Sequence, residues 1–193
     1  MLLTSEDRGV YPIAITPFDA QQEIDWASVD RLMDFYLACG VQGVTLLGIL
    51  GEPQKLSDAE QMALVRHVLR RVAGRLKVVV GASKASAHGL RAFAAEVMDL
   101  GAAGLMISPA PTVRHEEQLQ AFFAHVQRSL DPRVPIVLQD FPRLTGVTIS
   151  AGAMDRLVEA VPAIQVIKHE EDGGLRKITR ARQAEAAGRR RVA

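Results

Sequence analysis

The sequence has a single cysteine, Cys39, so no internal disulfide and no cysteine-rich metal site is available. This favours a reducing, cytoplasmic setting. Cys39 precedes Gly40 at an expected helix end, where we predict that it packs in the core. No run approaches the roughly 18 apolar residues that a membrane span requires. The first ten residues, MLLTSEDRGV, lack the basic and apolar segments of a signal peptide.

The sequence has no marked excess of positive or negative charge, because it contains 23 basic and 22 acidic residues and the net charge is +1. The densest basic run, Arg189 to Arg191, lies at the very end and is interpreted as a solvated helix end. We therefore expect no nucleic-acid partner. The five histidines do not have the spacing of a metal site. With 48% hydrophobic residues, the chain can form a real core, and we predict one domain over residues 1–193.

Short apolar, β-branched runs recur about every 30 residues, which is typical of repeated right-handed βαβ units. Most lack alternation, as expected of strands that are buried on both faces. The predicted strands are Val10 to Ile15, Gly43 to Leu47, Lys77 to Val80, Gly104 to Ile107, Val134 to Leu138 and Ile164 to Ile167.

Segments with helical spacing lie between these runs, and several carry capping residues. Asp25 is a predicted N-cap, with Gly40 as the stop of that helix. Ser57 and Glu60 fit a capping box. Ser86 and Ser150 are expected to cap two later helices, and residues 116 and 117, both Glu, suit the first turn of another.

Two architectures fit this order: an open doubly wound sheet and a closed barrel. The first strand is followed by Thr16-Pro17-Phe18-Asp19 and not by a Gly-x-Gly-x-x-Gly fingerprint, which weakens a dinucleotide-binding version. Periodicity alone does not choose between the two.

In either architecture the active site lies beyond the carboxyl ends of the strands, and Lys168 is the leading candidate among the residues at these ends. It follows the apolar run Ile164 to Ile167, so a strand delivers its amine to the mouth of the fold. Burial there favours the neutral amine, which is the form that attacks a carbonyl. By position alone, a lysine at a strand end is more often a non-catalytic surface residue than a catalytic one.

Other strand ends offer further candidates. Asp140 could transfer protons, although structural capping is equally compatible with its position. Lys84 could act as a neighbouring cation or hold a carboxylate, or be solvated. Glu52, in a glycine-flanked turn, is predicted to have a structural role. His169 should point to the side opposite Lys168, because neighbouring residues of a strand alternate.

With these residues in hand, the chain resembles the dihydrodipicolinate synthase and N-acetylneuraminate lyase family of Schiff-base lyases. The resemblance rests on four motifs in order: Pro12 to Phe18, Gly48-x-x-Gly51-Glu52, Asp140-Phe141-Pro142 with Thr145-Gly146, and Val166-Ile167-Lys168. It implies a (β/α)₈ barrel, assembly as a homotetramer, and an imine between Lys168 and a 2-oxo acid such as pyruvate. No metal and no organic cofactor is then required.

The chain departs from the family pattern at several site positions. Gln139 stands where a tyrosine relays protons, and Ile49 and Leu50 replace the hydroxyl residues of the Gly48 loop. The dihydrodipicolinate synthase reaction is therefore doubtful, and the Gln-Asp-Phe-Pro sequence looks more like the family's 2-oxo-3-deoxy sugar-acid dehydratases and aldolases. The predicted catalytic residues are Lys168, Gln139 and Asp140, and the predicted substrate-binding residues are Thr16, Gly48, Ile49, Leu50, Lys84 and Arg143.

Length is a second departure, because family members run to eight strands and this chain accounts for about six βα units of an incomplete barrel. The ending Val192-Ala193 is typical of a strand cut after its first residues. Open edges would leave backbone groups unpaired, so we expect the chain alone to be a poor monomer. A non-catalytic, truncated or degenerate barrel fragment that acts, if at all, through assembly is thus the rival hypothesis. An open-sheet protein that binds a small anion is a third.

Overall fold

The computed structural model describes residues 1–84 and 86–193 and contains a parallel sheet with helices packed against it. The strands are β1 (Gly43–Leu46), β2 (Lys77–Gly81), β3 (Gly104–Ile107), β4 (Ile136–Asp140) and β5 (Ile164–His169). The longer helices are α1 (Trp26–Ala38), α2 (Asp58–Val72), α3 (Ala87–Asp99), α4 (Glu116–Ser129), α6 (Ala151–Ala160) and α7 (Gly174–Ala186). Shorter helical turns are η1 (Ile49–Gly51), η2 (Pro53–Lys55) and α5 (Pro142–Thr145).

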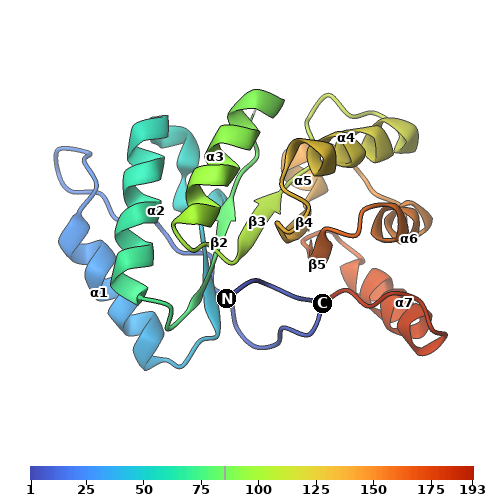
Figure 1. The fold of residues 1–193 in the computed structure, drawn as a ribbon, viewed down its shortest axis with the longest axis horizontal. Helices are drawn as coiled ribbons and strands as arrows, with labels where there is room; N and C mark the ends of the chain where they lie inside the picture. The colour runs from blue at the N-terminus through green and yellow to red at the C-terminus, as the bar shows by residue number, and fades with distance from the viewer. Residues whose placement is uncertain (85) are drawn as a thin grey trace.

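The strands lie in chain order, β1-β2-β3-β4-β5, and every neighbouring pair is parallel. Figure 1 shows the helices in an arc from α1 to α7 on one side of this curved sheet, with the two termini on the other side. An ion pair of 2.9 Å between Arg191 Nη1 and Glu6 Oε2 links the two terminal segments. The predicted alternation of strands and helices is therefore confirmed.

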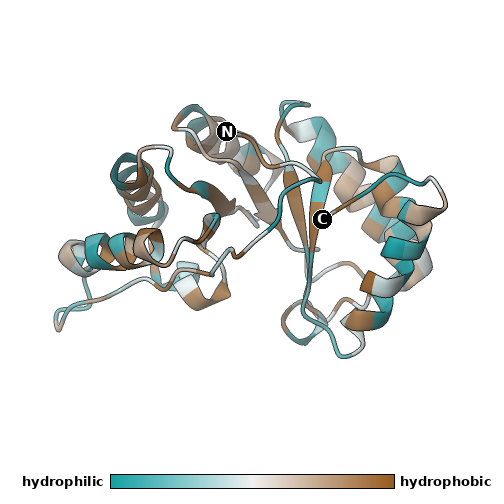
Figure 2. Ribbon diagram, turned by 90° about the horizontal axis from the view of Figure 1, so that it is seen from below, coloured by the Kyte–Doolittle hydropathy of each residue, from teal (hydrophilic) through white to brown (hydrophobic). Residues whose placement is uncertain are grey.

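The main core lies between the sheet and the helices. One face of each strand contributes buried apolar side chains, and these pack against the apolar stripes of the helices, as with Val68 of α2 and Phe123 of α4, both 0% exposed. Figure 2 shows the central strands largely in the hydrophobic colour, whereas the helices carry both colours. A sheet that is covered by helices needs apolar strands, and for this reason the strand sequences are continuous apolar runs without polar alternation.

The helix boundaries follow the predicted caps. The side chains of Asp25, Ser86 and Ser150 each accept a hydrogen bond from the first turn of the helix that follows. Ser57 and Glu60 form the predicted capping box of α2. The predicted core position of Cys39 is wrong: Cys39 is the C-cap residue of α1 and is exposed, and Gly40 follows it in the left-handed conformation that ends the helix.

The first predicted strand is only partly formed. Residues 10–15 run beside β1, with backbone bonds from Thr45 N to Pro12 O (2.8 Å) and from Ala14 N to Thr45 O (2.9 Å). A single parallel bridge, Ile13 to Thr45, results. Pro12 has no N–H to donate, and this shortens the ladder.

At the other edge, Ala193 continues the sheet beyond β5. Its N–H donates to Gln165 O at 3.0 Å, and its carbonyl accepts from Ile167 N at 2.9 Å. This is the bonding pattern of a parallel neighbour. Among the residues that the structure describes, β1 and β5 are not paired with each other, so the sheet is open.

Candidate active site

The ends of β4 and β5 determine which side chains meet. Both strands run further than predicted, to Asp140 and His169, and their register pairs Gln139 with Lys168 and Asp140 with His169. Because successive side chains of a strand point to opposite faces, Gln139 and Lys168 share the face away from the helices. Asp140 and His169 share the helix-covered face.

A continuous chain of hydrogen bonds crosses the strand ends on the face away from the helices. Ser108 Oγ donates to Gln139 Oε1 at 2.8 Å, and Gln139 Nε2 donates to Glu170 Oε2 at 2.7 Å. Lys168 Nζ lies 2.9 Å from Glu170 Oε1. Ser108 N in turn donates to Ser83 Oγ at 3.1 Å. We call Ser83, Ser108, Gln139, Lys168 and Glu170 the polar row.

Apolar side chains form a floor beneath the polar row, closer to the amino ends of the strands. Met106, Val137 and Val166 are register neighbours on β3, β4 and β5, and Leu3 packs against this group from the N-terminal segment. Leu3 is only 4% exposed, so the N-terminal segment covers this end. The row thus lies between an apolar floor and the open carboxyl edge of the sheet.

The Lys168 amine is partly exposed and lies beside a carboxylate. Its side chain is 28% exposed, which leaves an approach for a ligand, and its one ion-pair partner among the described residues is Glu170. The Glu170 carboxylate thus lies where a general base could reach a ligand bound at the Lys168 amine. Sequence reasoning missed Glu170, Ser108 and Ser83. Glu170 stands two residues after Lys168, and the two-residue repeat of a continuing strand was the signal for it.

Asp140 does not belong to this row. Its side chain is fully buried on the helix-covered face, where Oδ2 accepts from Lys177 Nζ at 2.8 Å and lies 3.1 Å from His169 Nδ1. Burial acts to raise the pKa of Asp140, but the hydrogen bonds from His169 and Lys177 outweigh it and hold that pKa below its usual value. The placement argues against proton transfer at Lys168 by Asp140. His169 points away from Lys168, as predicted.

Lys84 is also turned away from the polar row. Its amine contacts Asp58 Oδ1 and Gln61 Oε1 of α2, both at 2.7 Å, and lies 4.3 Å from the centre of the Phe93 ring of α3. Ser83 occupies the inner position at the end of β2, so its neighbour Lys84 faces the helices. The structure does not bring Lys84 to Lys168, contrary to the suggestion that it acts as a neighbouring cation.

The loop Gly48 to Glu52 is held from below by Thr16, whose hydroxyl donates to Gly51 O at 2.7 Å and is buried. At Gly48 a Cβ would lie 2.6 Å from Ile13 Cγ2 and 3.4 Å from Met106 Cε, so this backbone packs directly above the apolar floor. Leu50 is 62% exposed. Thr16 therefore positions the loop, and substrate contact by Gly48, Ile49 or Leu50 stays a prediction.

Glu52 and Arg143 both form surface ion pairs. Glu52 adopts a left-handed conformation, and its carboxylate pairs with Lys55 at 2.8 Å. Arg143, on α5, lies 3.2 Å from Asp172 and is 73% exposed. Its predicted contact with a substrate carboxylate remains a prediction, and Asp172 would compete for it.

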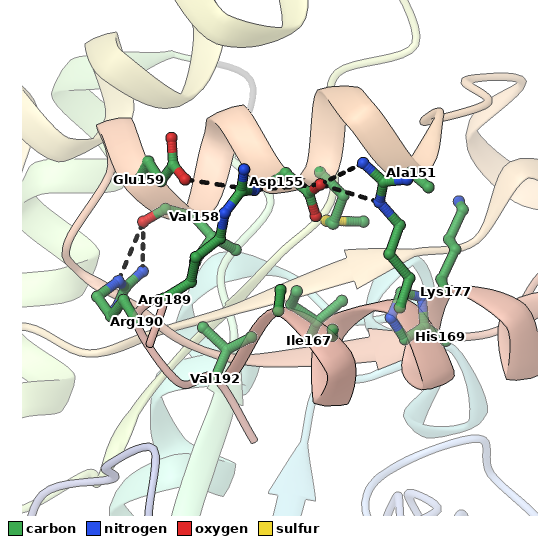
Figure 3. A pocket seen from close by; sticks show the side chains of 14 residues that line it. Ala151, Asp155, Val158, Glu159, Ile167, His169, Lys177, Arg189, Arg190 and Val192 are labelled. Atoms are coloured by element: carbon green, nitrogen blue, oxygen red, sulfur yellow. Dashed lines mark hydrogen bonds and ion pairs between the residues drawn. The ribbon is translucent and has the colours of Figure 1, made fainter. Parts of the chain in front are cut away.

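A separate small cavity, of about 40 Å³, lies on the helix-covered side of β5, between α6 and α7 (Figure 3). Ile167 and Val192 line it, with Lys177 and His169 at one end. It is not the space above Lys168. Within the described residues, no cluster of three or more potential metal ligands occurs, and no helix is long and apolar enough to cross a membrane.

Residues 6–187 match the profile of the dihydrodipicolinate synthetase family. The chain belongs to this family. It resembles a crystal structure of dihydrodipicolinate synthase from Rhodopseudomonas palustris with a TM-score of 0.96 and 39% identity, covering 100% of this chain and 64% of that one. The predicted fold class is thereby confirmed: the chain is part of a (β/α)₈ barrel.

Two curated relatives of the chain are named for different enzyme activities. An L-2-keto-3-deoxyarabonate dehydratase from Azospirillum brasilense is 32% identical over 91% of this chain and 57% of its own length. A 4-hydroxy-tetrahydrodipicolinate synthase from Pseudomonas putida is 33% identical over 80% of this chain and 52% of its own length. The chain thus spans about half the length of these relatives. The first of these names gives a 2-keto-3-deoxy acid as the substrate of that relative.

Proposed function

We propose that the protein is a lyase that holds a 2-oxo acid as an imine on Lys168 and acts as a dehydratase or aldolase on a 2-oxo-3-deoxy sugar acid. The observation that carries this is the pairing of the Lys168 amine with Glu170, 2.9 Å away, at the carboxyl edge of a family barrel. The proposal includes no metal and no organic cofactor, because a protonated imine is itself an electron sink.

The proposed steps use groups of the polar row. The Lys168 amine attacks the C2 carbonyl, and loss of water gives the iminium. Glu170 then removes a proton from C3, which yields an enamine. In a dehydratase the same Glu170, now protonated, returns the proton to the hydroxyl that leaves C4. In an aldolase Glu170 instead takes the proton of the C4 hydroxyl of the iminium, the C3–C4 bond breaks with release of an aldehyde, and the electron pair passes to the iminium to give an enamine, which Glu170 protonates at C3. In both cases water then hydrolyses the imine and frees Lys168.

Gln139 and Ser108 have a supporting part. Gln139 is only 3% exposed, with its amide bonded at one end to Ser108 and at the other to Glu170. Its amide cannot relay a proton as a phenol can, so Gln139 is proposed to orient the Glu170 carboxylate. With Ile49 and Leu50 in place of hydroxyl residues, this supports sugar-acid chemistry over the synthesis of dihydrodipicolinate.

The proposed substrate class is a 2-oxo-3-deoxy sugar acid. The similarity to the Azospirillum dehydratase agrees with a 2-oxo-3-deoxy acid. The backbone amides of Ile49 and Leu50, together with Arg143, are the proposed ligands of the substrate carboxylate. We further propose that the protein works as a homo-oligomer, a tetramer by the family resemblance.

Reductive trapping tests the imine. The complete product of the gene is incubated with pyruvate and borohydride, and the modified peptide is identified by mass spectrometry. We expect modification at Lys168 alone among the five lysines, Lys55, Lys77, Lys84, Lys168 and Lys177. Lys168→Arg should abolish trapping and Lys84→Met should keep it. A protein that traps nothing, or traps elsewhere, would refute the proposal and favour the non-catalytic hypothesis.

A further inference from the structure

A second set of ionisable side chains lies directly behind Lys168, on the helix-covered face of the sheet. Lys177 of α7 is 9% exposed and contacts Asp140 Oδ2 at 2.8 Å and Glu171 Oε1 at 2.7 Å. His169 Nδ1 lies 3.1 Å from the same oxygen of Asp140. Figure 3 shows Lys177 and His169 side by side at the end of the cavity between α6 and α7.

This cluster joins three elements at one point: Asp140 ends β4, His169 ends β5, and Lys177 lies in the first turn of α7. Glu171 belongs to the connection between β5 and α7 and is 13% exposed. A buried ion group of this kind costs desolvation and is seldom retained for stability alone. It does fix the relative position of the elements that supply its members.

Glu170 lies between two members of the cluster. His169 and Glu171 flank it in sequence, and both are held from behind, while its own N–H donates to the carbonyl of Asp140 at 2.9 Å. The backbone of Glu170 is therefore held by its own hydrogen bond to Asp140 and by the contacts of its two neighbours, His169 and Glu171. Its side chain emerges on the opposite face, toward Lys168 and Gln139.

We infer that Lys177 is a positioning residue, which holds the end of β5 so that the Glu170 carboxylate meets the Lys168 amine. This inference rests on the imine chemistry proposed above. Without the Lys177 ammonium, Asp140 and Glu171 are no longer drawn together and the end of β5 can shift. A displacement of about 1 Å can cost on the order of 10²-fold in rate.

The test compares Lys177→Met, Lys177→Arg and wild type, each as the complete gene product, by the rate at which the methyl protons of pyruvate exchange in D₂O with increasing pyruvate, while borohydride trapping reports imine formation. This exchange takes place through the enamine, so its rate reports proton transfer by Glu170. We expect the maximal rate of Lys177→Met to fall by about 10- to 10²-fold, while the pyruvate concentration for half-maximal rate changes by less than about threefold. Lys177→Arg should restore most of the rate, because it can still bridge the two carboxylates.

Lys77→Met is the matched control. Lys77 forms a comparably buried ion pair with Asp7, at 2.6 Å and with 18% and 13% of the side chains exposed, but at the amino end of β2. It should lose stability and keep the exchange rate of the folded protein. The double variant Asp140→Asn, Lys177→Met removes the charge left behind by the single change and is used if Lys177→Met does not fold.

The outcomes separate the two proposals. No trapping by wild type overturns the imine itself. Trapping by wild type together with an unchanged maximal rate in folded Lys177→Met, or in the double variant, overturns the positioning role. A fall of similar size in Lys77→Met also overturns it, because the effect would then follow from lost stability.

Discussion

Replacing Glu170 with glutamine separates imine formation from the proton transfer that follows. The change keeps the size of the side chain and leaves an amide that can still bond to Lys168 or Gln139, at the positions where the carboxylate oxygens lie 2.9 and 2.7 Å from these partners. It removes the only carboxylate of the polar row, and with it the group proposed to act as the general base.

The two steps should respond very differently. Losing a positioned general base costs roughly 10²–10⁴-fold in rate, which corresponds to about 3–5 kcal/mol in the barrier. Imine formation loses one charge-assisted hydrogen bond but keeps a neutral one, a difference of about 1 kcal/mol or less than roughly tenfold. Glu170 is 28% exposed, so the fold should tolerate the change.

Pyruvate in D₂O gives a direct assay, because its methyl protons exchange only through the enamine. Proton NMR should show exchange by wild type and a rate lower by about 10²–10⁴-fold for Glu170→Gln, with borohydride trapping still present. Glu117→Gln, the same chemical change at an 85% exposed site on α4, is the control. Exchange by Glu170→Gln within about tenfold of wild type, at equal trapping, would refute the role of Glu170.

Three further outcomes are expected. Asp140→Ala should lower the free energy of unfolding by about 1.5–3 kcal/mol, because Lys177 loses one of its two buried carboxylate partners and keeps only Glu171. Since folding lowers the pKa of Asp140 from 3.8, this stabilisation should be full above about pH 4 and disappear as the pH falls through the lower folded value. The free energies of unfolding of wild type and variant, measured by chemical denaturation, should therefore converge in acid. Equal stability at pH 7 would contradict the buried pair. With pyruvate and aspartate semialdehyde, the absence of a hydroxyl relay at Gln139 should keep kcat far below ~10 s⁻¹, and a rate near that value would show the substrate assignment to be wrong. Residues 1–193 expressed alone should aggregate or associate and unfold without a sharp transition, because Leu175 (75% exposed) and Ile178 (43%) leave α7 with uncovered apolar surface; a monomer in size-exclusion chromatography with a two-state melt would refute this.

Local chemistry carried most of the sequence-based prediction. Runs of β-branched residues, separated by segments with a helical period, were enough to predict parallel βαβ units. Ser57 with Glu60, and Ser150, predicted the starts of their helices because a cap satisfies backbone donors within three residues. Lys168 stood out for a similar reason, since an apolar strand that ends in a lysine brings its amine to the edge of the sheet.

The tertiary structure decided which neighbours meet, because the register between paired strands determines which side chains lie beside one another on each face of the sheet. Gln139 and Asp140 are adjacent in the sequence, yet only Gln139 shares a face with Lys168. Lys177 lies 37 residues from Asp140 along the chain, and no local pattern could pair them. Composition and period therefore predicted the parallel βαβ units and the place of Lys168 at a strand end, whereas register and packing between distant segments determined which side chains lie beside it.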